Sequence, residues 1–593
     1  MMVRDSFGRW FMVLVIAFVS STTLMSAPML DTPKYKALLE LQQYKSSMRY
    51  DYEDEKHKQA TLVNLNTNVG RWYLLDMVNK RGRSTILNLL TVRPDINITL
   101  DPTTPLLHIS KNGEDNISCS INDELDPIWR KYRRKKSSYV SVCGDRLLMV
   151  IHQDGYQRMI EKGAELLRWI GGDVGESIIS SVKTTFFKDK YRVEEKPKEL
   201  SSSARDGNKS VENNSTQIER ASVANRYLNT TLDTYTLGLK TQSGEKQLLA
   251  GEWYKLQNFS HAYTSIIMPG MVSKDILHSH SDRVDYINGI AKRSMVYLMA
   301  LDLKEYTLDW GHGTDHPGVG WSPRARNIKR DNRYGPDGFN SLKPLVTLGH
   351  VPPYEWYRTI GTFSAGFQNR HGAFKYGPLS RYDKAHPYGF MDDGVMMTTP
   401  SKELATIIIY LDGRVEMKRW TDEDFKHIDQ MRFIRQNGVP LIYPNYTDID
   451  EEEMDAVDTK SKGIPGKWVN NWGGGNWSGS VKVELRTPRG AACILPTPDA
   501  DYLVYAYFSS ATPSAMARVL QSYGCHFAIH LDMNSPGQAY ASLFKPNSNP
   551  KKIDSQLLMT DMEGYMGGES AHAPRFLIKP DYKDFFYILR RER

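Results

Sequence analysis

One segment near the C-terminus, residues 502–532, constrains the fold more than any other part of the chain. It opens with an apolar run rich in aromatic side chains at residues 502–508, which is typical of a strand. Thr512 and Pro513 follow, with the preferences of a helix N-cap and of a first helical position. The apolar residues after them recur at i, i+3, i+4 and i+7, as one face of a helix requires: Met516, Val519, Leu520 and Tyr523.

A second strand is expected after this helix. Gly524 ends the helix, and residues 525–531 form another apolar run that ends at Asp532. A helical crossover between two strands of one sheet makes those strands parallel. Polar residues at the carboxyl ends of such strands commonly bind ligands, which makes Asp532 and Asn534 candidate site residues.

Two other apolar segments are expected to add strands to the C-terminal domain. Residues 295–302 predict a buried strand, and residues 405–420 predict a hairpin. Asp412 and Gly413 at its centre favour a type I′ turn, in which both central residues have positive φ angles. We therefore expect an α+β or mixed α/β protein. Its C-terminal domain would hold a twisted mixed sheet with flanking helices, beside a smaller N-terminal α+β domain.

The N-terminus has the pattern of an export signal. Arg4 and Arg9 precede an uncharged apolar run at residues 10–19, and residues 20–27 are mostly small and uncharged. The apolar run is shorter than the roughly 20 residues that a membrane-spanning helix needs. We therefore expect a secreted, periplasmic or cell-envelope protein with no stable membrane span. An uncleaved anchor or a lipid-linked tail is the alternative.

The four cysteines agree with export. An even number of cysteines in an exported chain favours disulfides, and their places in the two halves favour the pairs Cys119–Cys143 and Cys493–Cys525. Four buried free thiols are the alternative. No CxxC motif occurs and the spacing suits no zinc site, so we expect no metal and no cofactor.

Changes in amino-acid composition along the N-terminal half indicate where its domains and linkers begin and end. After the export signal at residues 1–27 we expect an N-terminal domain of unknown role at 28–199, a polar linker or disordered loop at 200–221, and a connecting segment at 222–285. Six of the seven residues at 130–136 are basic, which suits an anionic polymer; a solvated basic face is the alternative. The net charge of +7 is mild for 593 residues, so no nucleic acid partner is expected.

Five short motifs follow one another between residues 295 and 545. They are residues 296–318, ending in Gly-His-Gly-Thr-Asp-His-Pro-Gly; residues 362–367, Thr-Phe-Ser-Ala-Gly-Phe; residues 434–441, Ile-Arg-Gln-Asn-Gly-Val-Pro-Leu; a Trp/Gly segment at 468–474 with an arginine element at 486–494; and residues 528–534, Ala-Ile-His-Leu-Asp-Met-Asn.

In the order and spacing of these motifs the chain resembles the phosphodiester glycosidase domain family. Enzymes of this type remove N-acetylglucosamine from a sugar-1-phosphodiester, and the family includes exported bacterial proteins. The resemblance implies a phosphodiester glycosidase-like domain at residues 286–560 and leaves residues 561–593 as a C-terminal extension.

The resemblance also implies a set of site residues. Cleavage of a glycosyl phosphodiester needs a carboxylate near the anomeric carbon and a cation that holds the departing phosphate. Asp532 is the candidate carboxylate, and Arg486 and Arg435 are the candidate phosphate ligands, because guanidinium presents a planar fork to phosphate oxygens. The remaining candidates for substrate contacts are Asn437, Asn534, Thr314 and His316.

One departure from the family bears on function. Met533, Asn534 and Ser535 replace glycines that follow the aspartate in the family and let a sugar phosphate approach the backbone. Two functions therefore stay open. The first is an exported hydrolase acting on a phosphodiester-linked sugar of the cell envelope or extracellular glycans, which the retained arginine, asparagine and aspartate favour. The second is a non-catalytic glycan- or polyanion-binding envelope protein on the same fold, which the altered glycine motif favours.

Overall fold

The computed structural model describes residues 38–112, 114–151, 153–156, 198–199, 218–314, 346–366, 389–400, 402–444, 461–470, 486–545, 553, 555–562 and 573–592. The predicted export signal at 1–27, residues 200–217 of the predicted linker, and His316 lie outside these ranges.

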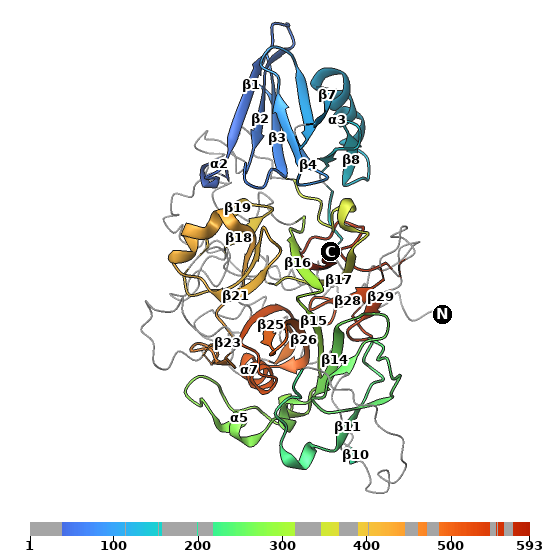
Figure 1. Cartoon of the computed structure of the whole chain (residues 1–593), viewed down its shortest axis with the longest axis vertical. Coiled ribbons are helices and arrows are strands. Elements are labelled where there is room, and N and C mark those ends of the chain that lie inside the picture. The colour runs from blue at the N-terminus through green and yellow to red at the C-terminus, as the bar shows by residue number, and fades with distance from the viewer. Residues whose placement is uncertain are drawn as a thin grey trace, which may run out of the picture. The chain divides into compact units, whose positions relative to one another are not determined.

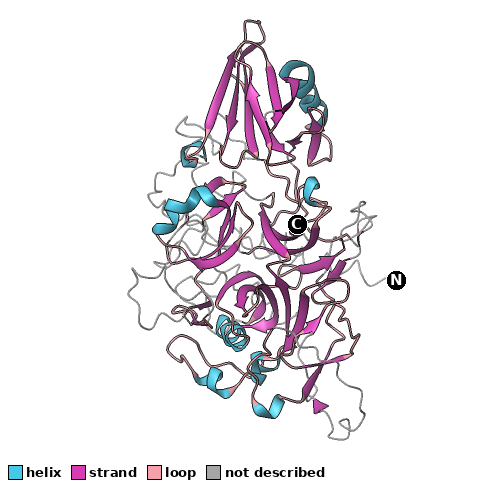
Figure 2. Ribbon diagram, in the orientation of Figure 1, coloured by secondary structure: helices cyan, strands magenta, loops and turns pink. Residues whose placement is uncertain are grey.

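Strands dominate the described residues, and the helices are few and short (Figures 1 and 2). Every described pair of named strands is antiparallel. The prediction of an α+β or mixed α/β class, with flanking helices, was therefore wrong. It generalised from one strand–helix–strand unit, whereas most of the chain folds into antiparallel sheets.

The described helices are short. The α-helices are α2 (Leu38–Leu41), α3 (Asp126–Tyr132), α5 (Lys274–His278) and α7 (Pro513–Ser522). A π-helical turn is η2 (Ile121–Leu125), and the 3₁₀ turns are η4 (Asn225–Tyr227), η5 (Pro269–Met271), η6 (Ala291–Arg293), η8 (Pro353–Glu355) and η11 (Glu423–Gln430). Among the described residues, no helix is both long and apolar enough to cross a membrane.

An eight-stranded sheet forms the centre of the C-terminal part. Its strands, in spatial order, are β13 (Tyr254–Lys255), β14 (Ala262–Ile267), β15 (Val296–Asp302), β26 (Asp501–Ala511), β25 (Thr487–Pro496), β27 (Phe527–Met533), β23 (Ile442–Tyr443) and β24 (Ile464–Pro465). Strands β14, β15 and β27 are buried along their whole length, as expected of strands that are covered on both faces.

The predicted strand–helix–strand unit is β26, α7 and β27. The Thr512 hydroxyl accepts a hydrogen bond from the Ala515 amide at the helix start, which confirms the predicted cap. Gly524 lies after the helix with a φ of 80°. Both β26 and β27 run antiparallel to β25, which lies between them. The two strands therefore point the same way, as the crossover requires, but they are not hydrogen-bonded neighbours.

A second sheet of five strands brings the end of the described chain into the interior. Its order is β16 (Tyr306–Gly311), β30 (Phe585–Arg590), β17 (Thr359–Ser364), β28 (Ala541–Phe544) and β29 (Ser555–Leu557). Strand β30 pairs with β16 on one side and with β17 on the other. Five of the six residues of β30 are buried. The residues just before this strand, such as Asp581 and Asp584, are buried as well.

A third sheet contains the predicted hairpin. Its order is β19 (Val395–Thr398), β18 (Phe390–Asp392), β22 (Met431–Gln436), β20 (Ala405–Tyr410) and β21 (Val415–Arg419). The pairing of β20 with β21 confirms the hairpin. The predicted type I′ turn was wrong, because Gly413 has a φ of 78° while Asp412 is not among the residues with positive φ. A single left-handed glycine is what a longer hairpin loop with a bulge requires.

The N-terminal part consists of two further antiparallel sheets, shown in blue in Figure 1. The six-stranded sheet is β1 (Ser46–Asp51), β2 (His57–Asn64), β3 (Trp72–Asn79), β4 (Ser84–Thr91), β9 (Leu147–Val150) and β8 (Tyr139–Val142). The three-stranded sheet is β5 (Ile96–Leu100), β6 (Leu106–Lys111) and β7 (Glu114–Ser120). A small third sheet elsewhere consists of β10 (Lys198–Glu199), β11 (Thr230–Asp233) and β12 (Gln247–Leu249).

Two disulfides join the cysteines in the pairs that the sequence favours. Cys119–Cys143 links β7 to the turn after β8, and Cys493–Cys525 links β25 to the residues before β27. The cysteine residues are all buried. Disulfides of this kind are compatible with an extracytoplasmic location.

Candidate functional site

Asp532 lies at the carboxyl end of β27, inside the protein. Its Oδ2 atom accepts a hydrogen bond from the ammonium group of Lys583, and its Oδ1 atom accepts one from the Met533 amide at 2.8 Å. Asp532 is 7% exposed and Lys583 is 3% exposed. Burial, and then the charge of Asp532, raise the pKa of the nearby Tyr505 hydroxyl well above 10. The Lys583 ammonium group and the Met533 amide together hold the Asp532 carboxylate in one orientation.

The residues just before β30 connect this carboxylate to further charges. Asp581 accepts hydrogen bonds from the Lys583 amide at 3.0 Å and from the Arg575 guanidinium at 2.6 and 3.0 Å. Asp584 lies 3.5 Å from the Arg435 guanidinium. We call this set the Asp532 centre; its members are Asp532, Lys583, Asp581, Arg575, Asp584 and Arg435. Each is less than 9% exposed.

Two of the predicted substrate-binding residues contact this centre or its strand. The Asn437 side-chain amide donates a hydrogen bond to the His530 carbonyl of β27. Thr314 donates its amide to the Asp581 carbonyl at 2.8 Å, and its hydroxyl accepts the Gly155 amide at 2.9 Å. The motifs that contain Asn437 and Thr314 lie far apart in the sequence, and the fold brings them to one place.

Two glycine segments of the sequence motifs also reach the centre. The Gly313 amide donates a hydrogen bond to an Asp584 carboxylate oxygen at 3.0 Å. Gly366 has a φ of 143°, and a Cβ atom there would lie 2.5 Å from the side-chain nitrogen of Asn437. Since so short a distance is not tolerated, glycine at 366 is required for Asn437 to occupy its position.

The two arginines predicted to hold phosphate have different surroundings. Arg435 is 1% exposed, and its guanidinium lies 4.2 Å from the Phe390 ring centre as well as near Asp584. Arg486 is half-buried and immediately precedes β25. The start of β25 lies beside the end of β27, where the Asn534 amide donates to the Pro488 carbonyl at 2.8 Å. Arg486 and Asn534 therefore lie at the same end of the two neighbouring strands β25 and β27.

Asn534 has a backbone conformation that favours glycine. Its φ is 89°, which is uncommon for a residue with a side chain. Glycine would take this conformation without strain, and here an asparagine adopts it. Asparagine tolerates positive φ better than most residues, but not without strain.

Substitution of Asn534 tests this strain. Asn534→Ala is expected to lower the free energy of unfolding by about 1–2 kcal/mol, because alanine is less tolerant of a φ of 89°, whereas Asn534→Gly is expected to stay within about 0.5 kcal/mol of the wild type. Urea unfolding measures both. Asn225→Ala, at an exposed asparagine in η4, is the matched control. Equal stability of Asn534→Ala and the wild type would contradict a strained backbone.

Buried basic groups line the other face of β27. The Arg489 guanidinium of β25 is fully buried, donates to the Ala511 carbonyl at 2.9 Å, and lies 3.3 Å from His530 Nε2. Burial lowers the pKa of Arg489 to about 9. Burial, and then the neighbouring Arg489 charge, lower the pKa of His530 well below 6.5. His530 is therefore neutral at physiological pH.

The sequence analysis did not single out the charged residues between 575 and 584, or Arg489 and His530. Residues 581–584 read Asp-Tyr-Lys-Asp and directly precede the apolar run Phe-Phe-Tyr-Ile-Leu at 585–589. Asp532 was identified because it lies at the carboxyl end of its predicted strand, whereas Lys583 and Asp584 precede theirs. The signal that identified Asp532 therefore does not indicate them.

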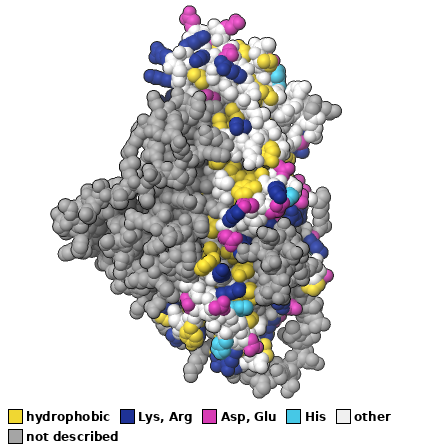
Figure 3. Space-filling view, turned by 90° about the vertical axis from the view of Figure 1, so that its left-hand side faces the viewer, with side chains coloured by type: hydrophobic (Ala, Val, Ile, Leu, Met, Phe, Trp, Pro, Cys, Tyr) yellow, Lys and Arg dark blue, Asp and Glu magenta, His cyan; other side chains and the backbone are white. Residues whose placement is uncertain are grey.

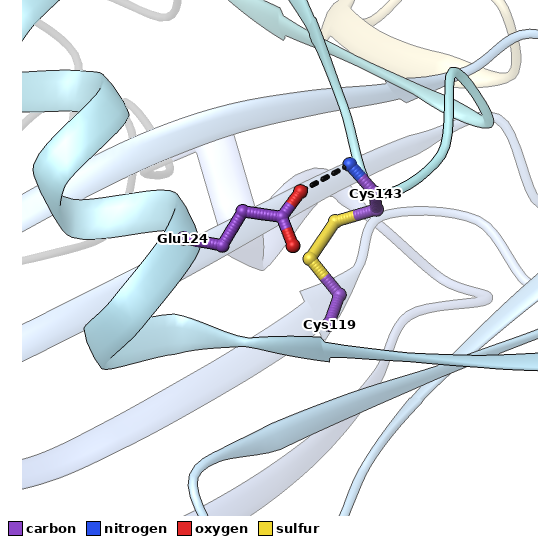
Figure 4. Close-up of side chains that lie close together, drawn as sticks. All are labelled: Cys119, Glu124 and Cys143. Carbon is purple, nitrogen blue, oxygen red and sulfur yellow. Dashed lines mark hydrogen bonds between the residues drawn. A yellow bond between two sulfur atoms is a disulfide. The ribbon is translucent and has the colours of Figure 1, made fainter.

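One group in the N-terminal part has the composition of a metal site, but its chemistry differs. Figure 4 shows Cys119, Glu124 and Cys143 close together. Both sulfur atoms belong to the disulfide, so neither is a thiolate ligand. Glu124 accepts the Cys143 amide at 2.7 Å. Glu124 thus fixes the backbone at Cys143, where φ is 54°.

Comparison with known proteins gives distant similarities only. No model of a known protein family matches the sequence, and neither does any curated protein. The catalytic domain of zebrafish N-acetylglucosamine-1-phosphodiester alpha-N-acetylglucosaminidase, auto-inhibited by its pro-peptide, is similar over 57% of this chain and 85% of that chain, with 12% identity and a TM-score of 0.27.

Two other solved structures are similar at the same level. A protein of Burkholderia pseudomallei described as exported covers 50% of this chain and 74% of its own, with 12% identity and a TM-score of 0.22. A protein of Synechocystis described as hypothetical covers 92% of this chain and 98% of its own, with 8% identity and a TM-score of 0.22.

Proposed function

We propose that this chain is an exported hydrolase that cleaves the bond between a sugar and phosphate in a glycosyl phosphodiester of the cell envelope or of extracellular glycans. The observation that supports it most is the Asp532 centre itself. A carboxylate at a strand end is held by Lys583, and Asp584, the next residue of the chain, pairs with Arg435 at 3.5 Å. Asn437 contacts the same strand, β27. These are the residue types that the reaction needs.

The proposed reaction assigns a role to each group. Water attacks the anomeric carbon while Asp532 accepts its proton, and the bond from that carbon to the phosphate oxygen breaks with its electron pair on the oxygen. Cationic side chains stabilise the phosphate charge that develops. Lys583 and Arg486 are the proposed groups for this role, since Arg435 is held against Asp584 and Phe390. Asn437, Asn534, Thr314 and His316 remain the proposed sugar contacts.

Product analysis tests the proposed activity. The purified chain is incubated with the methyl ester of N-acetylglucosamine-1-phosphate, and the sugar products are separated. Free N-acetylglucosamine is the expected product. Release of N-acetylglucosamine-1-phosphate instead, or no product at all, would contradict the proposal.

A second candidate function is binding of an anionic polymer at residues 130–136. All six basic side chains there are exposed: Arg130, Lys131, Arg133, Arg134, Lys135 and Lys136. Of these, Arg130 is paired with Asp126 at 2.6 Å. In contrast, Figure 3 shows Lys and Arg interspersed with Asp and Glu at the end of the N-terminal sheets on the face it presents.

Charge reversal tests the polyanion surface. The triple variant Arg133→Glu, Arg134→Glu and Lys136→Glu is expected to weaken heparin binding at least about tenfold, because each contact to an anionic polymer adds to affinity. The matched control reverses three exposed basic residues of the β3–β4 hairpin: Lys80, Arg81 and Arg83. If both triples weaken binding equally in a salt titration, the attraction is general and the run is no specific surface.

A further inference from the structure

Sequons for N-linked glycosylation, with the pattern Asn-x-Ser/Thr, occur along much of this chain. The sequence has nine of them, about twice the number that its content of asparagine, serine and threonine would give by chance. Four have their asparagine among the described residues: Asn97, Asn116, Asn229 and Asn258. A glycan is bulky and hydrophilic, so a folded protein can carry one only where the asparagine side chain reaches the surface.

The side chains of these four asparagines are all exposed. None of the four side-chain amides makes a hydrogen bond to another described residue. In contrast, the described asparagines that are buried, Asn66, Asn88 and Asn437, are hydrogen-bonded through their side chains and do not belong to sequons. In the described part of the chain, the sequons therefore coincide with asparagines that can be modified without disturbing the fold.

Two of these asparagines lie on the three-stranded sheet of the N-terminal part. Asn97 is on β5 and Asn116 is on β7, the two outer strands of this sheet. Asn97 pairs with Ser110 of the central strand β6, and the neighbours of Ser110 and Asn116, Ile109 and Ile117, pair with each other. Ile109 is buried, and side chains alternate along a strand, so both asparagines lie on the outer face of the sheet.

The other two asparagines lie in turns. Asn229 follows η4 and directly precedes β11, and Asn258 lies in the turn between β13 and β14. Asn258 has a φ of 74°, a left-handed conformation that asparagine tolerates better than most residues. Turns of this kind run over the protein surface, where an attached oligosaccharide extends into solvent.

We propose that Asn97, Asn116, Asn229 and Asn258 carry N-linked oligosaccharides in the exported protein. The donor is an oligosaccharide on a lipid diphosphate, and a transferase of the secretory pathway joins it to the side-chain nitrogen of each asparagine. The new bond forms between this nitrogen and the first sugar carbon. The bond from that carbon to the diphosphate oxygen breaks with its electron pair on the oxygen, and the nitrogen loses one proton to a base of the transferase.

The proposal shares with the proposed function only the export of the chain. It does not depend on turnover at Asp532, because the four asparagines are modified by a separate enzyme. A chain that carries the four glycans and releases no N-acetylglucosamine from the phosphodiester probe would contradict the proposed function alone.

Mass spectrometry of the chain isolated from its native source tests the proposal. Peptide N-glycosidase converts a glycosylated asparagine to aspartate with one oxygen atom from water, so digestion in water enriched in ¹⁸O labels each occupied site. Label is expected at all four asparagines and not at Asn225, an exposed asparagine outside any sequon. Four unlabelled positions would overturn the proposal. Equal label at Asn225 would do so too, because it would report spontaneous deamidation.

Variants of the full chain, secreted by cultured eukaryotic cells, test a single site. Ser260→Ala removes the hydroxyl that the Asn258 sequon requires and leaves the left-handed Asn258 in place, whereas Ser260→Thr keeps the sequon. On a denaturing gel we expect Ser260→Ala to migrate faster than the wild type by one glycan and Ser260→Thr to migrate with the wild type. After peptide N-glycosidase all three should migrate together. Equal migration of secreted Ser260→Ala and wild type before digestion would contradict a glycan at Asn258.

Discussion

Replacement of Asp532 by asparagine is expected to lower the rate of glycosyl phosphodiester hydrolysis by about 10²–10⁴-fold, the usual contribution of a positioned general base. Asparagine keeps the shape of the side chain, but its single carbonyl oxygen can accept only one of the two hydrogen bonds that Lys583 and the Met533 amide donate to the separate carboxylate oxygens of Asp532. It cannot accept a proton from water. The measurement is the initial rate of N-acetylglucosamine release from the phosphodiester probe at saturating concentration.

The control for this variant is Asp76→Asn on β3. Asp76 is also a buried carboxylate, at 6% exposure, and burial raises its pKa to about 6. The same chemical change there is expected to leave the rate within about twofold of the wild type. A rate for Asp532→Asn that matches that of Asp76→Asn would remove Asp532 from the reaction.

Replacement of Arg575 by methionine is expected to lower the free energy of unfolding by about 3–5 kcal/mol, the largest stability effect we predict. Arg575 and Asp581 are both fully buried, and the guanidinium contacts both carboxylate oxygens. Methionine fills similar volume but leaves the Asp581 charge without its main partner. Urea unfolding of the purified variant measures the loss.

A double substitution separates the ion pair from simple packing. Arg575→Met with Asp581→Asn removes both charges, so the double variant should regain part of the stability lost in the single one. The exposed pair Arg49–Asp51 is the control, and Arg49→Met is expected to cause no measurable change. If the double variant is as unstable as the sum of both single variants, the charges are not coupled.

Local structure was predictable where the residues of a single segment are enough to specify its strands, helix and turns. The Thr512 cap, the apolar helix face and the strands on either side follow from residues 502–532 alone, and the structure has all of them. The hairpin at 405–420 was predictable for the same reason. Both disulfide pairs follow from the separation of the cysteines into two halves.

The sheet class was not predictable, because it depends on pairing between distant segments. Strand β25 contains Gly490, Ala491 and Ala492, which have low strand propensity. It nevertheless lies between β26 and β27 and pairs with both in the antiparallel direction. The charges at 575–584 were missed for a related reason. Their role depends on β30 pairing with β16 and β17, which are more than 200 residues away in the sequence.

The position of the bond that breaks tests the central claim most directly. The wild-type chain is incubated with the N-acetylglucosamine phosphodiester probe in water enriched in ¹⁸O, and the methyl phosphate product is analysed by mass spectrometry. Attack at the anomeric carbon, the reaction proposed for Asp532, predicts methyl phosphate without ¹⁸O and free N-acetylglucosamine. Methyl phosphate that contains ¹⁸O would show attack at phosphorus and contradict a glycosidase.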